Sequence, residues 1–161
     1  MLRRPFPAGV SGLIWMRSPT LMSEYWNLPE ASARTLCDGW LDTGDIGLLD
    51  DEGFLYITDR AKDLINRGGE KIYSLELENI LSTYRGVREV AVIPTPSPVY
   101  GEEPVAFIVP DGQHHLTSEE ILDWLKVKIA RFKLPARIIF TRVLPRTHNG
   151  KVSKQQLKTR L

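Results

Sequence analysis

The chain has 161 residues, of which 42% are hydrophobic and 25% are charged, and its 21 Lys and Arg nearly balance its 20 Asp and Glu. This composition is typical of a globular protein, and the single cysteine, Cys37, excludes an internal disulfide framework. No apolar run approaches the roughly 20 residues of a membrane-spanning helix, and residues 1–10 lack the apolar stretch of a signal peptide, so we expect a cytoplasmic protein without a transmembrane segment.

The elements expected in the first 60 residues are mostly strands. Residues 11–17 are rich in strand formers, and a short helix that begins with proline is expected over residues 29–36. Residues 46–49 and 54–58 flank the polar turn 50–53, which is the signature of a β-hairpin. We expect this part of the chain to have little core of its own.

A different pattern begins after residue 60. Short strands at 64–67 and 71–73 flank the pair Gly68-Gly69, and Ser74 is expected to cap a helix that ends at Gly86. The apolar positions of this helix recur at i, i+3, i+4 and i+7, and they are Leu77, Ile80, Leu81 and Tyr84.

The last third of the chain continues with alternating strands and helices. Strands at 87–94 and 104–109 are expected to pair across a loop that contains Pro96, Pro98 and Gly101. Thr117 opens a capping box, followed by a helix whose apolar face reaches Pro135 and comprises Ile121, Leu122, Leu125, Ile129 and Phe132. A strand is expected at 138–143, and Ser153 opens the final helix.

Together these elements predict an α+β fold in two parts. Residues 62–161 form a small domain with short antiparallel sheets and about three helices, and residues 1–61 form a strand-rich segment before it. The charge is also divided, because residues 124–161 contain eleven Lys and Arg and no Asp or Glu. A basic segment favours an anionic ligand, and a solvated tail explains the same pattern equally well.

Two charged residues at the ends of the expected hairpin form the first candidate site. Asp45 follows a glycine, and Arg60 lies at the far end of the same hairpin, so the two side chains are expected to come close together. A carboxylate accepts both hydroxyls of a ribose diol, and guanidinium donates to sugar or phosphate oxygens. Taken singly, each residue is more often a turn residue or a surface ion.

The pair Gly68-Gly69 and Lys151, near the end of the chain, are further candidate site residues. Gly68-Gly69 allows the backbone to approach a narrow ligand, although a plain hairpin turn explains the pair as well. Lys151 follows an Asn-Gly turn and suits phosphate or carboxylate oxygens that gain charge during a reaction. A solvated surface lysine is the alternative for Lys151.

Two other classes of site are not expected. The histidines have no metal-ligand spacing with Cys37, so we expect no metal centre; they are His114, His115 and His148. Trp124 and Phe132 have the spacing of core residues in a helix, so nucleic acid is not an expected partner.

Four motifs in order resemble the adenylate-forming superfamily, which includes acyl-CoA synthetases, peptide-synthetase adenylation domains and luciferases. They lie at residues 39–45, 56–63, 68–78 and 144–151, and the segment 19–27 resembles the part of the family just before the Thr-Gly-Asp motif. The Gly-Gly-Glu sequence resembles CoA ligases more than peptide-synthetase domains, so thioester formation is favoured. The resemblance covers only the carboxy-terminal portion of such enzymes.

The resemblance assigns roles to five charged residues. Asp45 and Arg60 would hold the ribose hydroxyls of ATP or AMP, and Lys71 would contact phosphate. Lys62 would be the hinge between the two parts of the chain. Lys151 would reach the substrate carboxylate and the α-phosphate while the acyl-adenylate forms, and the small domain would then rotate about the hinge to admit CoA.

The resemblance also places CoA against the small domain. Gly68 and Gly69 would border the pantetheine tunnel, and Tyr100, Phe132 and Lys133 would lie near the CoA nucleotide. ATP, CoA and a carboxylate would be the substrates, with Mg²⁺ entering with ATP and none of them bound to the fragment alone.

A large amino-terminal domain with a phosphate loop would be the missing partner, so the chain alone is expected to be an inactive fragment. Its unpaired strand edges could also associate with one another. A carrier-protein acceptor, or a free-standing module that docks on a separate large domain, is the alternative.

Overall fold

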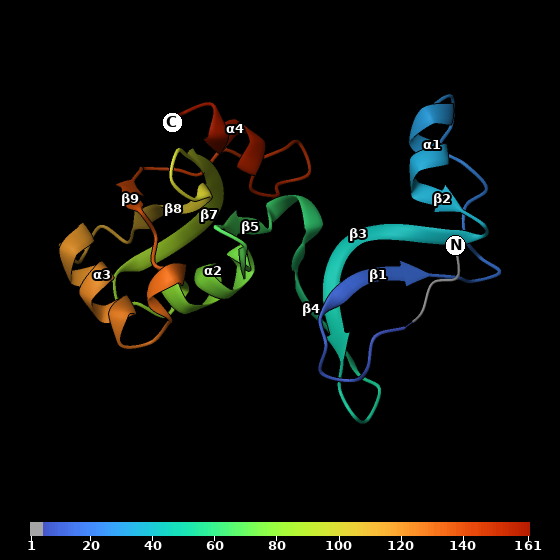
Figure 1. The fold of residues 1–161 in the computed structure, drawn as a ribbon. Coiled ribbons are helices and arrows are strands. Elements are labelled where there is room, and N and C mark those ends of the chain that lie inside the picture. Colours follow the sequence, from blue (N-terminus) through green and yellow to red (C-terminus); the bar gives the residue numbers. More distant parts are fainter. Residues whose placement is uncertain (1–4) are drawn as a thin grey trace. The chain divides into compact units, whose positions relative to one another are not determined.

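The computed structural model describes residues 5–161, which fold into two compact units (Figure 1). One unit ends at Lys62, and the other comprises Asp63–Leu161. The chain is an α+β protein with two sheets, as predicted. No helix of the described residues is both long enough and apolar enough to span a membrane.

The first unit is built around one long central strand. Strand β3 (Trp40–Leu49) pairs antiparallel with β1 (Gly12–Met16), β2 (Leu36–Cys37) and β4 (Leu55–Arg60), and helix α1 (Pro29–Thr35) precedes β2. The predicted hairpin is therefore confirmed as β3–β4. Its turn is closed by Asp50, whose Oδ1 accepts hydrogen bonds from the backbone N–H groups of Glu52 and Phe54.

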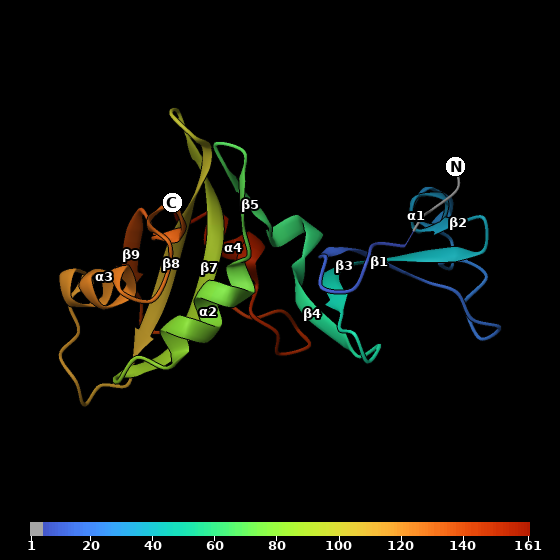
Figure 2. The same ribbon diagram turned by 60° about the horizontal axis from the view of Figure 1, so that its bottom comes forward.

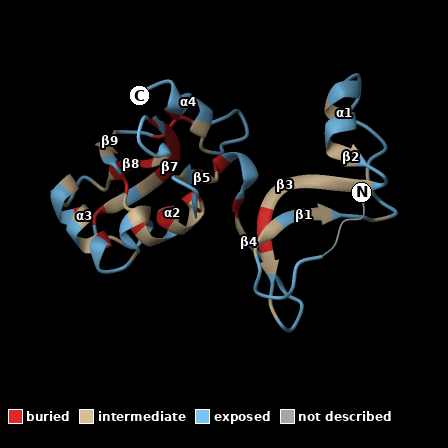
Figure 3. Ribbon diagram, viewed as in Figure 1, coloured by how far each residue is buried: buried red, intermediate tan, exposed pale blue. Residues whose placement is uncertain are grey.

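The first unit buries little apolar surface of its own, as expected. Within residues 5–62, Ile46 is the one large hydrophobic residue that is buried (Figure 3). Strand β4 exposes consecutive large side chains instead, namely Leu55, Tyr56 and Ile57, and Trp26 is 83% exposed. Consecutive side chains of a strand point to opposite faces of the sheet, so apolar surface is exposed on both sides of β4.

The second unit has a five-stranded sheet with helices on it. It contains β5 (Ile65–Arg67), β6 (Glu70–Ile72), α2 (Ser74–Ser82), β7 (Val87–Ser97), β8 (Gly101–Pro110), α3 (Ser118–Lys126), β9 (Arg137–Phe140) and α4 (Lys154–Lys158). The order β6-β5-β8-β7 is antiparallel, and β9 adds to β8 in parallel. Short 3₁₀ turns lie at Ala61–Asp63 and Arg131–Lys133.

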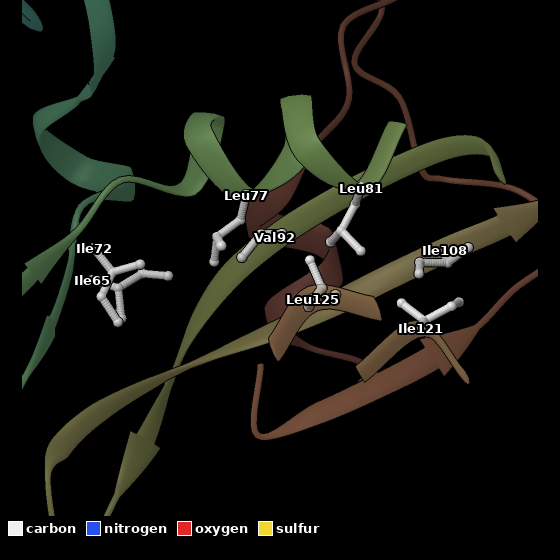
Figure 4. Packing of buried hydrophobic residues seen from close by; sticks show 9 residues of the cluster. Ile65, Ile72, Leu77, Leu81, Val92, Ile108, Ile121 and Leu125 are labelled. Carbon is white, nitrogen blue, oxygen red and sulfur yellow. The ribbon is translucent and has the colours of Figure 1, made fainter. Parts of the chain in front are cut away.

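The β7–β8 hairpin is buried on both of its faces. On one face, side chains of α2 and α3 pack against the hairpin and the β5–β6 strands (Figure 4). This cluster consists of Ile65, Ile72, Leu77, Leu81, Val92, Ala106, Ile108, Ile121 and Leu125. The other face is covered by Leu144 and by Leu157 of α4, over Ala91, Ile93, Val105, Phe107 and Val109. Burial on both faces explains why β7 and β8 are apolar runs rather than alternating strands.

Several element boundaries differ from the prediction. Strands β7 and β8 extend almost to their turn, so the expected loop shrinks to residues 98–100. Helix α3 ends at Lys126 because the Leu125 carbonyl accepts N–H groups of the following turn and Ala130 is extended. Ile129 and Phe132 still pack on the core, which explains the misleading helical periodicity beyond the helix.

The three expected helix caps have different outcomes. Thr117 and Ser153 cap α3 and α4 through hydrogen bonds from the N–H groups of Glu120 and Gln156, as predicted. The cap expected at Ser74 is wrong, because Ser74 is the first residue inside α2 and is fully buried. Its hydroxyl instead accepts a hydrogen bond from Lys154.

Candidate functional site

The β3–β4 hairpin brings Asp45 and Arg60 together, as its turn predicts. The two residues are cross-strand partners, and Arg60 Nε lies 3.1 Å from Asp45 Oδ1. The Arg60 side chain is 55% exposed and that of Asp45 27%, so both keep polar atoms open to solvent. The pair can therefore present a carboxylate oxygen and guanidinium donors to one polar ligand.

The backbone around Asp45 is held in place by short-range hydrogen bonds. Gly44 has a φ of 70°, which favours glycine, and its N–H donates to the carboxylate of Asp42. The Thr43 hydroxyl donates to the carbonyl of Ile14 in β1 and accepts the N–H of Asp45 at 3.1 Å. The backbone of the Thr-Gly-Asp motif is thus held in place on β3, the central strand of the sheet.

Lys62 lies at the end of the first unit. It belongs to the 3₁₀ turn Ala61–Asp63 and is exposed, whereas Asp63 beside it is buried. Its position is compatible with the hinge role that the resemblance implies, which stays a prediction.

The glycine pair forms the tight turn between β5 and β6. Gly68 and Gly69 have φ values of 60° and 95°, which is the pair of left-handed conformations that a two-residue hairpin turn requires. The N–H of Gly68 donates to the carbonyl of Tyr100 at 2.8 Å, and that of Gly69 donates to Asn66 Oδ1. Figure 2 shows this turn beside the tip of the β7–β8 hairpin. The turn is therefore docked on the segment that carries Tyr100.

Sequence reasoning missed the residue that connects the predicted CoA contacts. Arg67 Nη1 donates to the carbonyl of Phe132 at 2.8 Å, and its guanidinium lies 4.7 Å from the centre of the Tyr100 ring. Lys133 Nζ is bound by both carboxylate oxygens of Glu76, at 2.7 and 2.8 Å. Its charge is thus already partnered within the unit, which the sequence did not predict.

Lys71 lies on β6 directly opposite Asn66 and is exposed. Lys71 belongs to the second unit and lies two residues after the glycine turn, whereas Asp45 and Arg60 belong to the first unit. Its contact with phosphate stays a prediction.

Lys151 lies on a closed and well hydrogen-bonded loop. Arg146 and Val152 form an antiparallel bridge, and within it the Thr147 N–H donates to the Lys151 carbonyl at 2.8 Å. Gly150 has a φ of 78°, and its N–H donates to the Thr147 carbonyl. The side chain of Lys151 is exposed, and no carboxylate among residues 5–161 forms an ion pair with it. An ordered loop thus presents an unpaired ammonium group to solvent.

The Lys151 loop is also tied to the sheet. The guanidinium of Arg146 donates to the Gly150 carbonyl at 2.8 Å and forms an ion pair with Glu89 of β7. The loop and the first residues of β7 are therefore held together by one side chain.

A second lysine nearby is in the opposite situation. Lys154 Nζ lies 2.7 Å from Glu78 Oε1 and donates to the hydroxyl of Ser74, and the two charged side chains are only 18% and 16% exposed. Glu78 also accepts the backbone N–H of Val92. Lys154 is a structural cation, which connects α4 to α2 and β7, whereas Lys151 has no such partner.

One carboxyl group outside the candidate site has a shifted pKa. The pKa of Asp111 is lowered because its side chain accepts the backbone N–H of Gln113 and a hydrogen bond from the His114 ring. A lowered folded-state pKa stabilises this loop above the pKa of an unfolded Asp, and the contribution disappears as the pH falls through the folded value.

The chain matches the family of AMP-binding enzyme C-terminal domains over residues 76–151. It is 41% identical to the feruloyl-CoA synthase of an Amycolatopsis species over 97% of this chain and 32% of that protein. It is 39% identical to the fatty acid–[acyl-carrier-protein] ligase ScoC of Streptomyces coeruleorubidus over 98% of this chain and 30% of that protein. It thus spans about a third of the length of the curated relatives it matches.

A solved structure shows the same fold. The crystal structure of ATP-bound MatB from Rhodopseudomonas palustris matches with a TM-score of 0.90 and 35% identity, over 96% of this chain and 31% of that one. Residues 76–151 are thus an AMP-binding enzyme C-terminal domain. The chain belongs to the adenylate-forming superfamily and corresponds to its carboxy-terminal region.

Proposed function

We propose that the complete protein is an ATP-dependent acyl-CoA synthetase. A carboxylate oxygen of the acid attacks the α-phosphorus of ATP, forming acyl-adenylate and releasing pyrophosphate. The sulfur of CoA then attacks the acyl carbon, its proton is lost, and AMP leaves. The matches to acyl-CoA ligases support this reaction class.

The main support for the proposal is that Lys151 is exposed and has no ion-pair partner among the described residues. Negative charge gathers on the α-phosphate oxygens as the acyl-adenylate forms, and a cation placed beforehand stabilises that charge. Lys151 is exposed on an ordered loop and, within the described part of the chain, has no carboxylate partner. Its ammonium group is therefore available to a ligand, whereas that of Lys154 is not.

The Asp45–Arg60 pair supports binding of the nucleotide. We infer that Asp45 accepts the ribose hydroxyls and that Arg60 donates to ribose or phosphate oxygens. Lys71 is proposed to contact phosphate. Mg²⁺ enters with ATP as part of the substrate, and residues 5–161 contain no group of three or more His, Cys, Asp or Glu arranged to hold a metal.

In the second half-reaction, the thiol of CoA must enter the space that Lys151 is proposed to occupy during adenylation. We infer that the second unit rotates about Lys62, which withdraws Lys151 and brings the Gly68-Gly69 turn to the entering pantetheine. Two compact units joined near this lysine support such a motion. The exposed apolar side chains of β4 are proposed to pack on the rest of a large amino-terminal domain.

The role of Asp45 gives a quantitative expectation. In the complete protein, Asp45→Ala should raise the KM for ATP by about tenfold or more, because hydrogen bonds to a charged group contribute roughly 1.5–3 kcal/mol. The KM is measured by carboxylate-dependent ATP–pyrophosphate exchange. The control is Asp51→Ala, an exposed acid in the hairpin turn, which should leave the KM unchanged. Equal KM values for Asp45→Ala and the wild type would contradict the ribose role.

The acceptor is tested by assaying the complete protein with CoA and with a phosphopantetheinylated carrier protein in parallel. We expect carboxylate-dependent pyrophosphate exchange and a thioester with CoA. The second candidate function is an adenylating enzyme that transfers the acyl group to a carrier protein. The likeness to a fatty acid–[acyl-carrier-protein] ligase favours it. A thioester formed only on the carrier protein would support this second candidate. Absence of exchange with any carboxylate tested would contradict the adenylating function.

We expect the 161-residue chain alone to form no acyl-CoA, because it spans about a third of the length of its curated relatives and the resemblance implies a phosphate loop in a separate large domain. The measurement is thioester formation by the purified chain with ATP, CoA and a panel of carboxylates. Turnover by the chain alone would contradict this expectation. Activity that returns when a separately produced large domain is added would support the module that docks in trans.

A further inference from the structure

Three separate segments of the second unit meet at the side chain of Arg67. Its Nη1 donates to the carbonyl of Phe132 at 2.8 Å and to that of Leu134 at 3.3 Å. The guanidinium also stacks 4.7 Å from the centre of the Tyr100 ring, at the tip of the β7–β8 hairpin. Arg67 itself is the last residue of β5, directly before the glycine turn. One side chain therefore connects three parts of the surface.

The glycine turn has little packing of its own. A Cβ added at Gly69 would meet no atom within 4 Å, and one added at Gly68 would meet only the Tyr100 ring, at 3.5 Å. The turn is held instead by the N–H of Gly68 on the Tyr100 carbonyl and by that of Gly69 on Asn66. Because glycine is conformationally free, such a turn keeps its position only if its neighbours are fixed. Arg67 contacts one of these neighbours, because its guanidinium lies over the Tyr100 ring.

We propose that Arg67 is a positioning residue for the thioester-forming half-reaction. It clamps the Tyr100 turn and the 131–134 segment to the end of β5, and so sets where the Gly68-Gly69 turn meets the pantetheine arm of CoA. The consequence for CoA rests on the proposed function, whereas the clamp itself rests on the contacts of Arg67 alone. We assign the Arg67 contacts to the thioester-forming step, so the two half-reactions are expected to respond differently to the loss of Arg67.

The geometry requires arginine rather than any cation. A planar guanidinium can stack on an aromatic ring and still donate in its own plane to two carbonyls, while an ammonium group has no stacking face. Arg67→Lys therefore keeps the charge and removes the clamp. A purely electrostatic role would be rescued by lysine, and a clamp would not.

The experiment uses Arg67→Ala and Arg67→Lys in the complete protein, with Arg160→Ala, an exposed arginine near the end of α4, as the matched control. Three quantities are measured: carboxylate-dependent pyrophosphate exchange, the rate and KM for CoA in thioester formation, and hydrogen exchange of the Gly68 and Gly69 amides. Retained pyrophosphate exchange also shows that each variant is folded.

We expect both Arg67 variants to lower kcat/KM for CoA by about tenfold or more, because small displacements in a positioned site reduce rates strongly. Pyrophosphate exchange should stay within about twofold of the wild type, and the Gly68 amide should exchange about tenfold faster. The control should match the wild type in all three measurements.

Unchanged exchange of the Gly68 amide in Arg67→Ala would overturn the clamp. Full rescue by lysine, or an equal loss in both half-reactions, would also overturn it. If the wild-type protein shows no carboxylate-dependent pyrophosphate exchange, the proposed function fails, and the amide measurement still decides whether Arg67 holds the turn.

Discussion

Replacing Lys151 by alanine in the complete protein should lower carboxylate-dependent pyrophosphate exchange by about 10²–10³-fold, the range found when one donor to a developing oxyanion is removed. The physical reason is that a preplaced ammonium group stabilises the charge on the α-phosphate without reorganisation. Lys151 has no carboxylate partner among the described residues, so its removal leaves no carboxylate without a counter-ion. The fold should therefore be unaffected.

The control for Lys151 is Lys158→Ala, a second exposed lysine seven residues later. It should exchange pyrophosphate at the wild-type rate. Thioester formation from preformed acyl-adenylate should also be nearly normal in Lys151→Ala, because the lysine is proposed to have left the site by then. Exchange at the wild-type rate in Lys151→Ala would remove this residue from the mechanism.

The largest expected effect on stability comes from Lys154. Lys154→Ala leaves the carboxylate of Glu78 largely buried without its cation, and breaking a buried ion pair from one side costs about 3–5 kcal/mol. The free energy of unfolding is measured by amide hydrogen exchange of β7 and β8 in the 161-residue chain, which monitors the second unit separately from the first.

The chain offers a matched exposed pair as the control. Lys126 Nζ also lies 2.7 Å from its partner, Asp123, but these side chains are 59% and 72% exposed. Lys126→Ala should therefore cost less than about 1 kcal/mol, although the distance is the same. The double variant Lys154→Met/Glu78→Leu should recover part of the loss, because no unpaired charge remains. Equal effects of Lys154→Ala and Lys126→Ala would show that burial does not decide the strength of these pairs.

Much of the local structure could be predicted because it depends on neighbouring residues. The β3–β4 hairpin follows from its polar turn, and the Asp45–Arg60 pair follows from the hairpin. The caps at Thr117 and Ser153 are likewise encoded within four residues. Such signals are readable because their hydrogen bonds form between residues close in sequence.

The rest depends on contacts between distant parts of the chain. The hydroxyl of Ser74 was expected to cap α2, but it pairs with Lys154, which lies 80 residues later. Arg67 reaches the carbonyl of Phe132, 65 residues away. No local sequence pattern indicates a partner so many residues away. The sequence therefore could not distinguish Arg67 and Lys154, which have partners inside the unit, from a solvent-facing cation such as Lys151.

The β7–β8 hairpin, buried on both faces, determines the spacing of the two chemical ends of the second unit. The Lys151 loop is attached near its start, through Arg146 and Glu89, and the glycine turn is attached at its tip, through Tyr100. At about 3.3 Å per residue, the eight steps from Glu89 to Ser97 along β7 separate these attachments by roughly 26 Å. A stiff spacer of this length separates the two attachments, which agrees with the proposed function, in which Lys151 and the glycine turn enter the site in succession.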